Sequence, residues 1–389
     1  MIFHHSKVCQ TSIVNVANGA NAMSFEPLKM TIGRHFRLPY LWMMKIRHAF
    51  WLVGLIGALI ATIACDGQHN TVTASFYYWK TLYEPDSTEK HALARIGAKK
   101  LFVRIMDIDN QGPQGEAVPV SAITFREPLP DSVAIVPVIY VVNKVLKEVS
   151  PAQRNELAGR LIDFVAAKVK QAGKTGFDEL QIDCDWTAST REAYFGLLEA
   201  LRTRLTDSVR LTATLRLHQV RNQRASGIPP VDRALLMCYN MGNLRKPGEH
   251  NSIMDLQEME TYLKDFLSEY PLPVDIALPL FSWSVVFRDG LYAGISKRLD
   301  PAMLSDTTIF ARSAESSLYR LKIALPTAGL RRGDVVRREE TRWEDLSAAA
   351  DFLARHKRKE KFTLLFYHLD NQVFKSFSDE QLQEIVHRF

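Results

Sequence analysis

The sequence lacks most of the patterns that identify nucleotide, nucleic-acid or serine-hydrolase chemistry. It contains no Gly-x-Gly-x-x-Gly and no phosphate-binding loop of the Gly-Lys-Ser/Thr type, so it offers no motif support for nucleotide binding. Gly-x-Ser-x-Gly is also missing, which leaves a serine hydrolase of that type without support. No recognised nucleic-acid-binding motif occurs. We therefore expect no cofactor and no nucleic-acid partner.

Cysteine is scarce. The four cysteines are Cys9, Cys65, Cys184 and Cys238, and they form no Cys-x-x-Cys pair and no spacing typical of a metal site. A disulfide framework and a metal site are therefore not predicted. Cys184 and Cys238 lie within apolar, strand-like runs, where a free cysteine behaves as a small buried hydrophobic residue.

The composition is that of a folded protein without a strong charge of either sign. The 389 residues are 47% hydrophobic and 24% charged, with a formal net charge of +6. This length suits one large domain or two small ones. The positive charge comes from scattered Lys and Arg and from residues 355–361. It indicates a solvated basic face more than an anionic partner.

The N-terminal region reads as a targeting segment. Residues 43–48 are basic, and residues 49–64 form an apolar run broken by Thr62. This run is short for a membrane span of about 20 residues but suits a signal peptide. It ends at Cys65, in a sequence that resembles a bacterial lipoprotein signal in which the cysteine is acylated. The alternatives are a plain secretory signal and a short anchor helix.

This interpretation divides the chain into segments. Residues 1–42 are an over-extended N-terminus, because they lie upstream of a normal signal peptide. Residues 43–64 are the signal peptide, 65–71 a lipid-anchored tether, and 72–389 the folded domain. We expect the protein to be lipid-anchored to a membrane of the bacterial cell envelope.

The rest of the chain alternates between strand-like and helical periodicity. Eight strands are predicted at 73–81, 100–109, 133–143, 179–186, 210–219, 233–242, 274–283 and 362–370. Most are separated by helical segments, predicted around 89–97, 151–172, 190–205, 255–270 and 343–356, with a last helix at 379–388. The helix from Pro151 follows Ser150, which is able to cap it.

Alternating strands and helices favour a parallel sheet, and eight such units favour a closed (β/α)8 TIM barrel. An open doubly wound sheet is the alternative. The stretch 288–341 has no dominant period. We read it as an insertion between the seventh strand and its helix.

The stretch from Asp178 to Trp186 carries the clearest candidate site. Its apolar residues alternate with Gln181, Asp183 and Asp185, which puts two carboxylates on one strand face. Such a placement lowers stability unless the acids are hydrogen-bonded or solvated. In a barrel the active site lies at the carboxyl ends of the strands, so this pair is a functional candidate.

Polar and aromatic residues recur at the other predicted strand ends. Carboxylates suit proton transfer, and flat rings suit the apolar faces of sugars. The candidates for substrate binding are Trp79, Arg104, Trp186, Arg216, His218, Asn240, Trp283 and Asp370, and Tyr239 joins Asp183 and Asp185 as a catalytic candidate.

Each candidate has a structural alternative. Trp79 and Trp283 could pack at the rim, and His218 could be a hydrogen-bonded structural histidine. Arg104 and Arg216 could neutralise Asp183. Asp107 and Asp109 could be turn residues ahead of the loop that begins at Asn110.

The fourth strand resembles a known motif. Family 18 glycoside hydrolases, the chitinase-like barrels, carry Asp-x-x-Asp-x-Asp-x-Glu there. This chain has Asp178, Gln181, Asp183 and Asp185 at the four places. The family's Met-x-Tyr-Asp reads Met237-Cys238-Tyr239-Asn240. The chain also resembles a group of bacterial lipoproteins with chitinase-like barrels, from which no activity carries over.

The resemblance implies roles for these residues. In the family the final Glu is the general acid, the Asp before it orients the substrate's N-acetyl group, and the Tyr holds that group. Asp185 would then be the proton donor, with Asp183 as base, nucleophile or orienting group. Because Asp185 is one methylene shorter than Glu, either the chemistry has moved or the barrel binds glycans without cutting them. The predicted function is a glycoside-hydrolase-like protein acting on an envelope or environmental polysaccharide. The alternative is a non-catalytic glycan-binding or scaffold lipoprotein.

Overall fold

The structure is a computed structural model that describes residues 71–112, 116–296, 299–312 and 316–389. These residues belong to the unit Gly67–Phe389, one of the two units into which the chain divides. The predicted N-terminal extension, the signal peptide and Cys65 lie outside the described residues, as does the tether apart from Thr71. None of the described helices is long and apolar enough to span a membrane.

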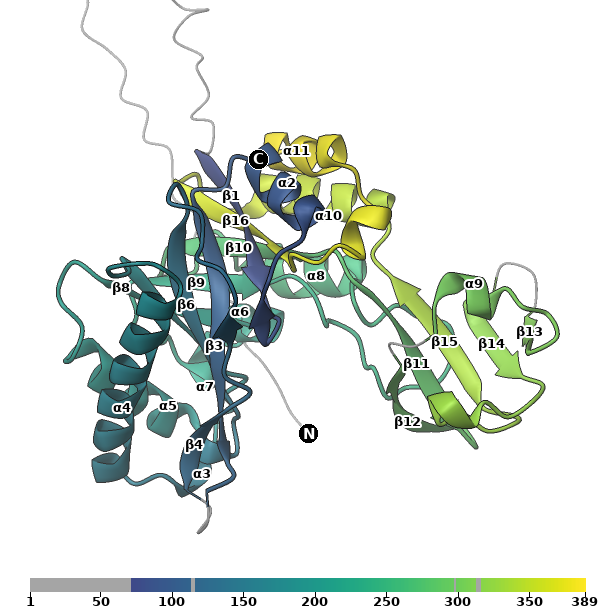
Figure 1. The fold of residues 1–389 in the computed structure, drawn as a ribbon, viewed down its shortest axis with the longest axis horizontal. Coiled ribbons are helices and arrows are strands. Elements are labelled where there is room, and N and C mark those ends of the chain that lie inside the picture. The colour runs from purple at the N-terminus through teal and green to yellow at the C-terminus, as the bar shows by residue number, and fades with distance from the viewer. Residues whose placement is uncertain (1–70, 113–115, 297–298, 313–315) are drawn as a thin grey trace, which may run out of the picture. The chain divides into compact units, whose positions relative to one another are not determined.

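Eight parallel strands close into a barrel (Figure 1). Each pairs with the next in chain order, and β1 pairs with both β3 and β16 to complete the ring. The strands are β1 (Val72–Tyr78), β3 (Lys100–Asn110), β6 (Ala134–Val141), β7 (Glu179–Asp183), β8 (Arg210–Leu215), β9 (Arg233–Met237), β10 (Val274–Pro279) and β16 (Phe362–Tyr367). The predicted TIM barrel is confirmed.

Helices follow most of the strands, as the alternating pattern predicted. They are α2 (Ser87–Arg95), α3 (Val145–Glu148), α4 (Pro151–Gln171), α5 (Arg191–Arg202), α6 (Leu217–Arg221), α7 (Gln223–Ser226), α8 (Leu256–Leu263), α10 (Trp343–His356) and α11 (Asp379–His387). Helix α4 begins as the sequence indicated. The Ser150 side chain accepts from the backbone N–H of Gln153, and Pro151 occupies the first turn.

Several short elements decorate the barrel. Strand β4 (Ala117–Val120) pairs antiparallel with β3, and β2 (Leu82–Tyr83) pairs with β5 (Thr124–Phe125). A 3-10 turn, η2 (Val373–Lys375), follows β16.

Side chains along each barrel strand point alternately into two hydrophobic cores. On β1, Phe76 and Tyr78 pack toward the core shared with the helices, while Tyr77 belongs to the cluster inside the barrel. On β7, Leu180 and Ile182 join the core shared with the helices. The intervening side chains therefore point into the barrel, as a strand's period of two requires. This alternation turns Gln181 and Asp183 inward.

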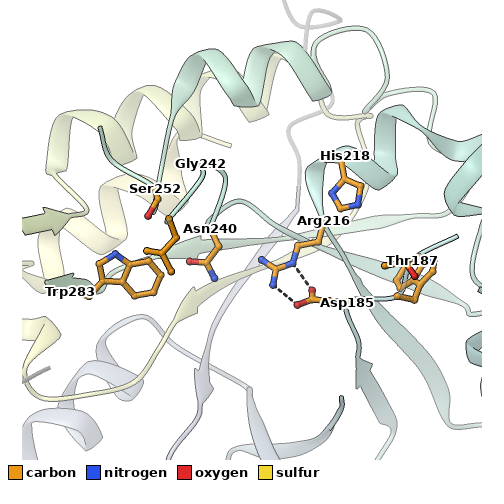
Figure 2. Close-up of a pocket in the computed structure, with 10 residues that line it drawn as sticks. Asp185, Thr187, Arg216, His218, Asn240, Gly242, Ser252 and Trp283 are labelled. Carbon is orange, nitrogen blue, oxygen red and sulfur yellow. Dashed lines mark hydrogen bonds and ion pairs between the residues drawn. The ribbon is translucent and has the colours of Figure 1, made fainter. Parts of the chain in front are cut away.

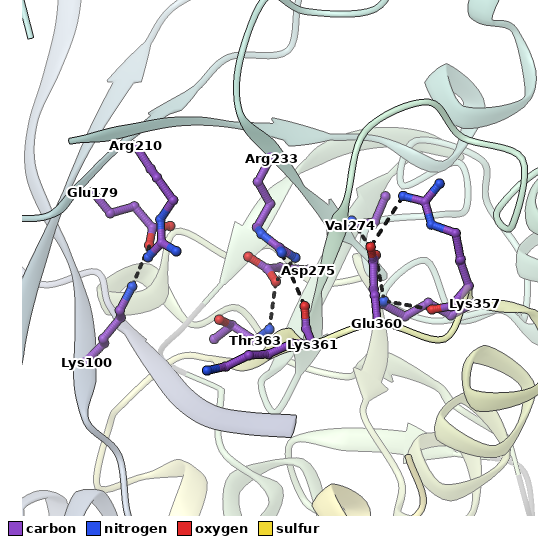
Figure 3. A network of polar contacts seen from close by, with 11 residues as sticks. Lys100, Glu179, Arg210, Arg233, Val274, Asp275, Lys357, Glu360, Lys361 and Thr363 are labelled. Atoms are coloured by element: carbon purple, nitrogen blue, oxygen red, sulfur yellow. Dashed lines mark hydrogen bonds and ion pairs between the residues drawn. The ribbon is translucent and has the colours of Figure 1, made fainter. Parts of the chain in front are cut away.

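Buried ion pairs cluster near the amino ends of the strands (Figure 3). Glu179 at the start of β7 accepts from Lys100 at 2.7 Å and from Arg210 at 3.1 Å. Asp275 accepts from Arg233 at 3.0 Å and from the backbone N–H of Thr363 at 2.7 Å. These acids are satisfied by their neighbours at the face of the barrel that usually serves stability.

An antiparallel sheet stands between β10 and α10 in the chain. It consists of β11 (Ser282–Arg288), β12 (Leu291–Ser296), β13 (Phe310–Arg312), β14 (Leu318–Leu321) and β15 (Val335–Glu340), with α9 (Pro301–Leu304) and the 3-10 turn η1 (Pro326–Ala328) in its connections. The seventh barrel strand ends at Pro279, so the prediction that it runs to Trp283 is wrong. Trp283 belongs instead to β11.

One buried ion pair ties this inserted sheet to the loop between β9 and α8. The side chains of Arg337 and Glu339 are both 0% exposed, and Arg337 Nε donates to Glu339 Oε1 at 2.6 Å. Arg337 also donates to the backbone carbonyls of Leu244, Lys246 and Gly248. The pair therefore fixes the path of a loop that has little regular structure of its own.

We predict that Glu339→Ala lowers the free energy of unfolding by about 3–5 kcal/mol, because it leaves the Arg337 charge buried without its carboxylate. Glu384→Ala, which removes an exposed partner of Arg388, is the matched control and should lower it by less than about 1 kcal/mol. Urea unfolding measures both. Equal losses in the two variants would contradict the structural role of the buried pair.

Candidate functional site

Two adjoining hollows lie at the carboxyl ends of the barrel strands. The larger has a volume of about 1180 Å³ and the smaller about 490 Å³. Both are lined by Asp185, Arg216, Asn240 and Trp283, so they form one cleft. Of the predicted residues, the larger hollow contains Trp79, Asp183, Asp185, Arg216, Tyr239, Asn240, Trp283 and Asp370. The smaller adds Trp186 and His218.

Asp183 is the last residue of β7 and points into the barrel. It is 8% exposed, and the Thr214 hydroxyl donates to its Oδ1 at 2.7 Å. Burial and the nearby Asp185 carboxylate raise the pKa of Asp183 to about 6, against the opposing effects of Thr214 and Arg216. A carboxyl group with such a pKa exchanges its proton near neutral pH, which is the range that acid–base catalysis uses.

Asp185 lies beyond the end of β7 and is held by Arg216, which lies beyond the end of β8 (Figure 2). Arg216 Nε donates to one carboxylate oxygen at 2.6 Å and Nη2 to the other at 2.8 Å. Two parallel hydrogen bonds of this kind make a strong, oriented pair. Both oxygens of Asp185 are therefore engaged by a cation.

One alternative from the sequence was that Arg104 and Arg216 neutralise Asp183. In the structure, each arginine pairs with another carboxylate. Arg216 pairs with Asp185, and Arg104 Nη1 donates to both oxygens of Asp107 at 2.6 and 2.7 Å. Arg104 is buried and does not line either hollow, so its prediction as a direct substrate contact is corrected. Its guanidinium lies 5.8 Å from the ring centre of Trp79 and supports that ring.

Aromatic rings form a connected wall. The ring centre of Tyr367 lies 5.2 Å from that of Tyr239, 5.6 Å from Phe281 and 5.7 Å from Trp79. Phe281 in turn lies 5.1 Å from Trp283. All five residues line the larger hollow. Rings that pack on one another hold their planes without help from a ligand.

Glu339 fixes the end of this wall. The indole N–H of Trp283 donates to Glu339 Oε2 at 2.9 Å, and the same oxygen accepts from the backbone N–H of Ser252 at 2.8 Å. Ser252 and Trp283 both line the smaller hollow. Figure 2 shows Asn240 between Trp283 and Arg216. The inserted sheet thus contributes directly to the cleft.

Two predicted residues take other roles than the sequence suggested. Trp186 is 2% exposed; its ring stacks on Tyr194 and its N–H donates to the carbonyl of Ser226 at 2.9 Å. Most of its ring is therefore committed to the protein, although it borders the smaller hollow, and its contact with a sugar stays a prediction. His218 lies on α6, because β8 ends at Leu215, so the predicted strand 210–219 is wrong in its last residues. The His218 side chain is exposed at the edge of the smaller hollow.

The remaining polar residues are partly committed to neighbours. Asp370 lies 3.4 Å from Lys80 Nζ and accepts from the backbone N–H of Gln372 at 2.9 Å. Asn240 has a positive φ of 55°, a conformation that asparagine tolerates better than most residues. Its backbone N–H donates to the carbonyl of Ile253 at 2.8 Å.

Sequence reasoning missed several cleft residues. Tyr140 and Tyr367 line the larger hollow without having been singled out, and Asp107, considered as a turn residue, lies on β3 and lines it too. Burial and the charges of Asp185 and Asp183 raise the pKa of Tyr140 to about 12. Tyr77 donates to Gln181 inside the barrel. The signal for Tyr140 and Tyr367 was their place near the carboxyl ends of apolar strands.

The arrangement favours binding through rings, carboxylates and amides. Within the described part of the chain, no group of three or more His, Cys, Asp or Glu side chains could hold a metal ion. The chemistry available without further groups is hydrogen bonding, stacking and proton exchange at Asp183.

No protein-family model matches the sequence. No curated protein sequence matches it either.

The fold is similar to those of solved structures. The C-terminal domain of a putative chitinase from Desulfitobacterium hafniense superposes with a TM-score of 0.52 at 12% identity, over 82% of this chain and 100% of that one. The spore cortex-lytic enzyme SleL of Bacillus cereus gives a TM-score of 0.50 at 11% identity, over 82% of this chain and 75% of that one. This chain therefore shares the barrel fold of chitinase-like structures.

Proposed function

We propose that this protein is a lipid-anchored, glycan-binding barrel of the bacterial cell envelope, and that the cleft at the carboxyl ends of its strands holds a polysaccharide. The connected wall of Trp79, Tyr367, Tyr239, Phe281 and Trp283 carries the proposal. Flat rings match the apolar faces of pyranose units, and the neighbouring carboxylates and amides match their hydroxyl groups. The likeness in fold to chitinase-like structures supports it.

Binding is favoured over hydrolysis because Asp185 is held in an ion pair with Arg216. Hydrolysis of a glycosidic bond requires a carboxylic acid that carries a proton toward the leaving oxygen. Both oxygens of Asp185 accept hydrogen bonds from Arg216, so neither is free to face a glycosidic oxygen while the pair is formed. That Asp185 is the proton donor stays a prediction, and this ion pair argues against it.

Hydrolysis remains the second candidate because of Asp183. Its carboxyl group lines the larger hollow and its raised pKa of about 6 is suited to proton exchange. In that case Asp183 is the acid–base group, and the Asp185–Arg216 pair positions it or the substrate.

We expect Trp79→Ala and Trp283→Ala each to weaken glycan binding by about tenfold or more, since each removes a partly buried ring from the aromatic wall. Trp343→Ala, which removes the same side chain from α10 outside the cleft, is the control and should bind normally. Calorimetric titration with chitohexaose and with solubilised envelope glycans measures the effect. Undiminished binding in both cleft variants would reject the aromatic wall as the binding surface.

We predict that Asp183→Asn raises the free energy of unfolding at pH 7 by roughly 1–2 kcal/mol. The folded-state pKa of Asp183 is raised from 3.8 to about 6. The folded chain therefore holds this proton to higher pH than the unfolded chain, and stability falls as pH rises from about 4 to about 6. Asn removes this part of the pH dependence. Urea unfolding of both proteins at pH 4 and pH 7 measures it, and Asp275→Asn tests the other acid with a pKa of about 6.

The same variant separates the two candidate functions. Binding without turnover of aryl-glycosides or envelope glycans, in wild type and Asp183→Asn alike, supports the glycan-binding proposal. Turnover that rises or falls through pH 6 and disappears in Asp183→Asn would replace it with hydrolysis. Turnover that survives in Asp183→Asn would remove this residue from the chemistry.

The anchor rests on the sequence that ends at Cys65. Two acyl chains with many methylenes, each contributing about 0.8 kcal/mol when buried, would hold the protein on a membrane surface. We expect metabolic labelling with a fatty acid to mark the wild-type protein and to leave Cys65→Ala unmarked. Cys238→Ala, at a buried cysteine of the folded domain, is the matched control and should keep the label. An unlabelled wild type, or label on Cys65→Ala, would exclude acylation at this residue.

A further inference from the structure

Arg338 on β15 lines the larger hollow from the inserted sheet. Its side chain is 16% exposed, so the guanidinium is largely withdrawn from water while it borders the cleft. None of the chemistry considered above uses it. A largely buried cation beside a binding cleft needs a negatively charged partner, which comes from the protein or from a ligand.

The other arginines of this hollow are fully engaged. Arg216 makes two hydrogen bonds to Asp185. Arg288 donates from Nε to Asp334 at 3.0 Å and from Nη2 to its other oxygen at 2.8 Å. In each case a carboxylate fills the forked edge of the guanidinium, which leaves no room there for an anionic ligand.

Arg338 has no such carboxylate. Its Nη2 donates to the Ser282 hydroxyl. Its Nε lies 3.9 Å from Glu340 Oε2, beyond hydrogen-bonding distance, and is buried without a hydrogen-bond partner among the residues that the structure describes. An unsatisfied buried donor on a charged group is unfavourable. Nη1 makes no hydrogen bond to any residue that the structure describes, so the Nη1–Nη2 edge of Arg338 retains capacity to bind an anion.

The acids of the same hollow do not compete for it. Asp107 is paired with Arg104, Asp185 with Arg216, and Asp370 with Lys80. Asp183 accepts from Thr214, and Asp300 caps α9 by accepting from the backbone N–H of Met303 at 2.7 Å. Each of these acids therefore has a partner within the protein, whereas Arg338 lacks a hydrogen-bonded carboxylate.

We propose that Arg338 binds a carboxylate carried by the glycan, so that the cleft selects polymers with acidic sugars over neutral ones. This inference rests on the proposed glycan-binding function and adds the substrate class. A carboxylate fits the guanidinium fork with two hydrogen bonds. Asp300 and Glu340 lie near enough to influence Arg338 electrostatically, which favours a group with one negative charge over a doubly charged phosphate.

The protonation of Arg338 agrees with this assignment. Burial lowers the pKa of its guanidinium, against the opposing effects of Glu340, Tyr319 and Asp300. An arginine nevertheless stays charged at neutral pH. The charge is therefore buried without full compensation, and a bound carboxylate would supply the missing partner.

The test compares the purified full-length protein with Arg338→Gln, Arg338→Lys and Arg320→Gln. Arg320 is an exposed arginine on β14 that does not line the hollow, so its variant controls for net charge. The ligands are peptide-free peptidoglycan glycan strands with free carboxylates, the same strands after conversion of the carboxylates to methylamides, and chitohexaose. Calorimetric titration gives each Kd, and circular dichroism verifies folding.

We expect the wild type to bind the free-carboxylate strands at least about tenfold more tightly than the amidated ones. Arg338→Gln should lose this preference while binding amidated strands as before. Arg338→Lys should keep part of it, because lysine retains the charge without the fork. Arg320→Gln should match the wild type.

Three results would overturn the inference, and they separate the role of Arg338 from the proposed function. Equal binding of free and amidated strands by the wild type, or an unchanged preference in Arg338→Gln, would reject the role of Arg338 and leave glycan binding intact. Failure of the wild type to bind any of the three ligands would reject the proposed function together with this inference.

Discussion

Closure of the eight-stranded ring is the constraint on which the site depends. Because β1 pairs with β16 on one side and β3 on the other, the carboxyl ends of all eight strands meet at one rim. Rings from opposite ends of the chain then touch: the ring centres of Tyr77 and Tyr367 lie 5.8 Å apart. The closed ring also leaves each strand one inward and one outward face, which turns Asp183 inward. No local interaction could place these groups together.

The two acids of the fourth strand differ because the strand ends between them. Asp183 closes β7 and stays inside the barrel, where burial raises its pKa. Asp185 lies past the last paired residue and meets Arg216 from the neighbouring strand end. Burial therefore disfavours the charged form of Asp183, whereas the charge of Asp185 is balanced by the ion pair with Arg216. Such a division is found where environments assign different roles to similar side chains.

The sequence predicted what depends on periodicity and little of what depends on loop geometry. The eight strands and the start of α4 at Pro151 follow from local patterns, and the rim follows from the barrel rule. Trp186 could not be placed this way, because its direction is set by the Ser226 carbonyl and the Tyr194 ring, both from later segments. The prediction of Arg104 as a substrate contact depended on a similar unseen feature. Its partner Asp107 lies three residues away on the same strand, which has a register shift between Arg104 and Met106. Alternation alone places i and i+3 on opposite faces, and the shift brings them together.

The burial of the charged residues at the end of β15 could not be predicted from their composition. In the sequence, Arg337-Arg338-Glu339-Glu340 has the composition of a solvated edge. In the folded chain, alternation places these four residues on two faces of the strand. Arg337 and Glu339 are buried, and they hold the loop that carries Ser252 and the indole of Trp283. Arg338, between them, faces the larger hollow. A strand that anchors the cleft wall with alternate residues necessarily fixes what the residue between them presents to a ligand. The inserted sheet therefore supports the cleft wall, and the proposed selectivity would come from a residue of the same strand.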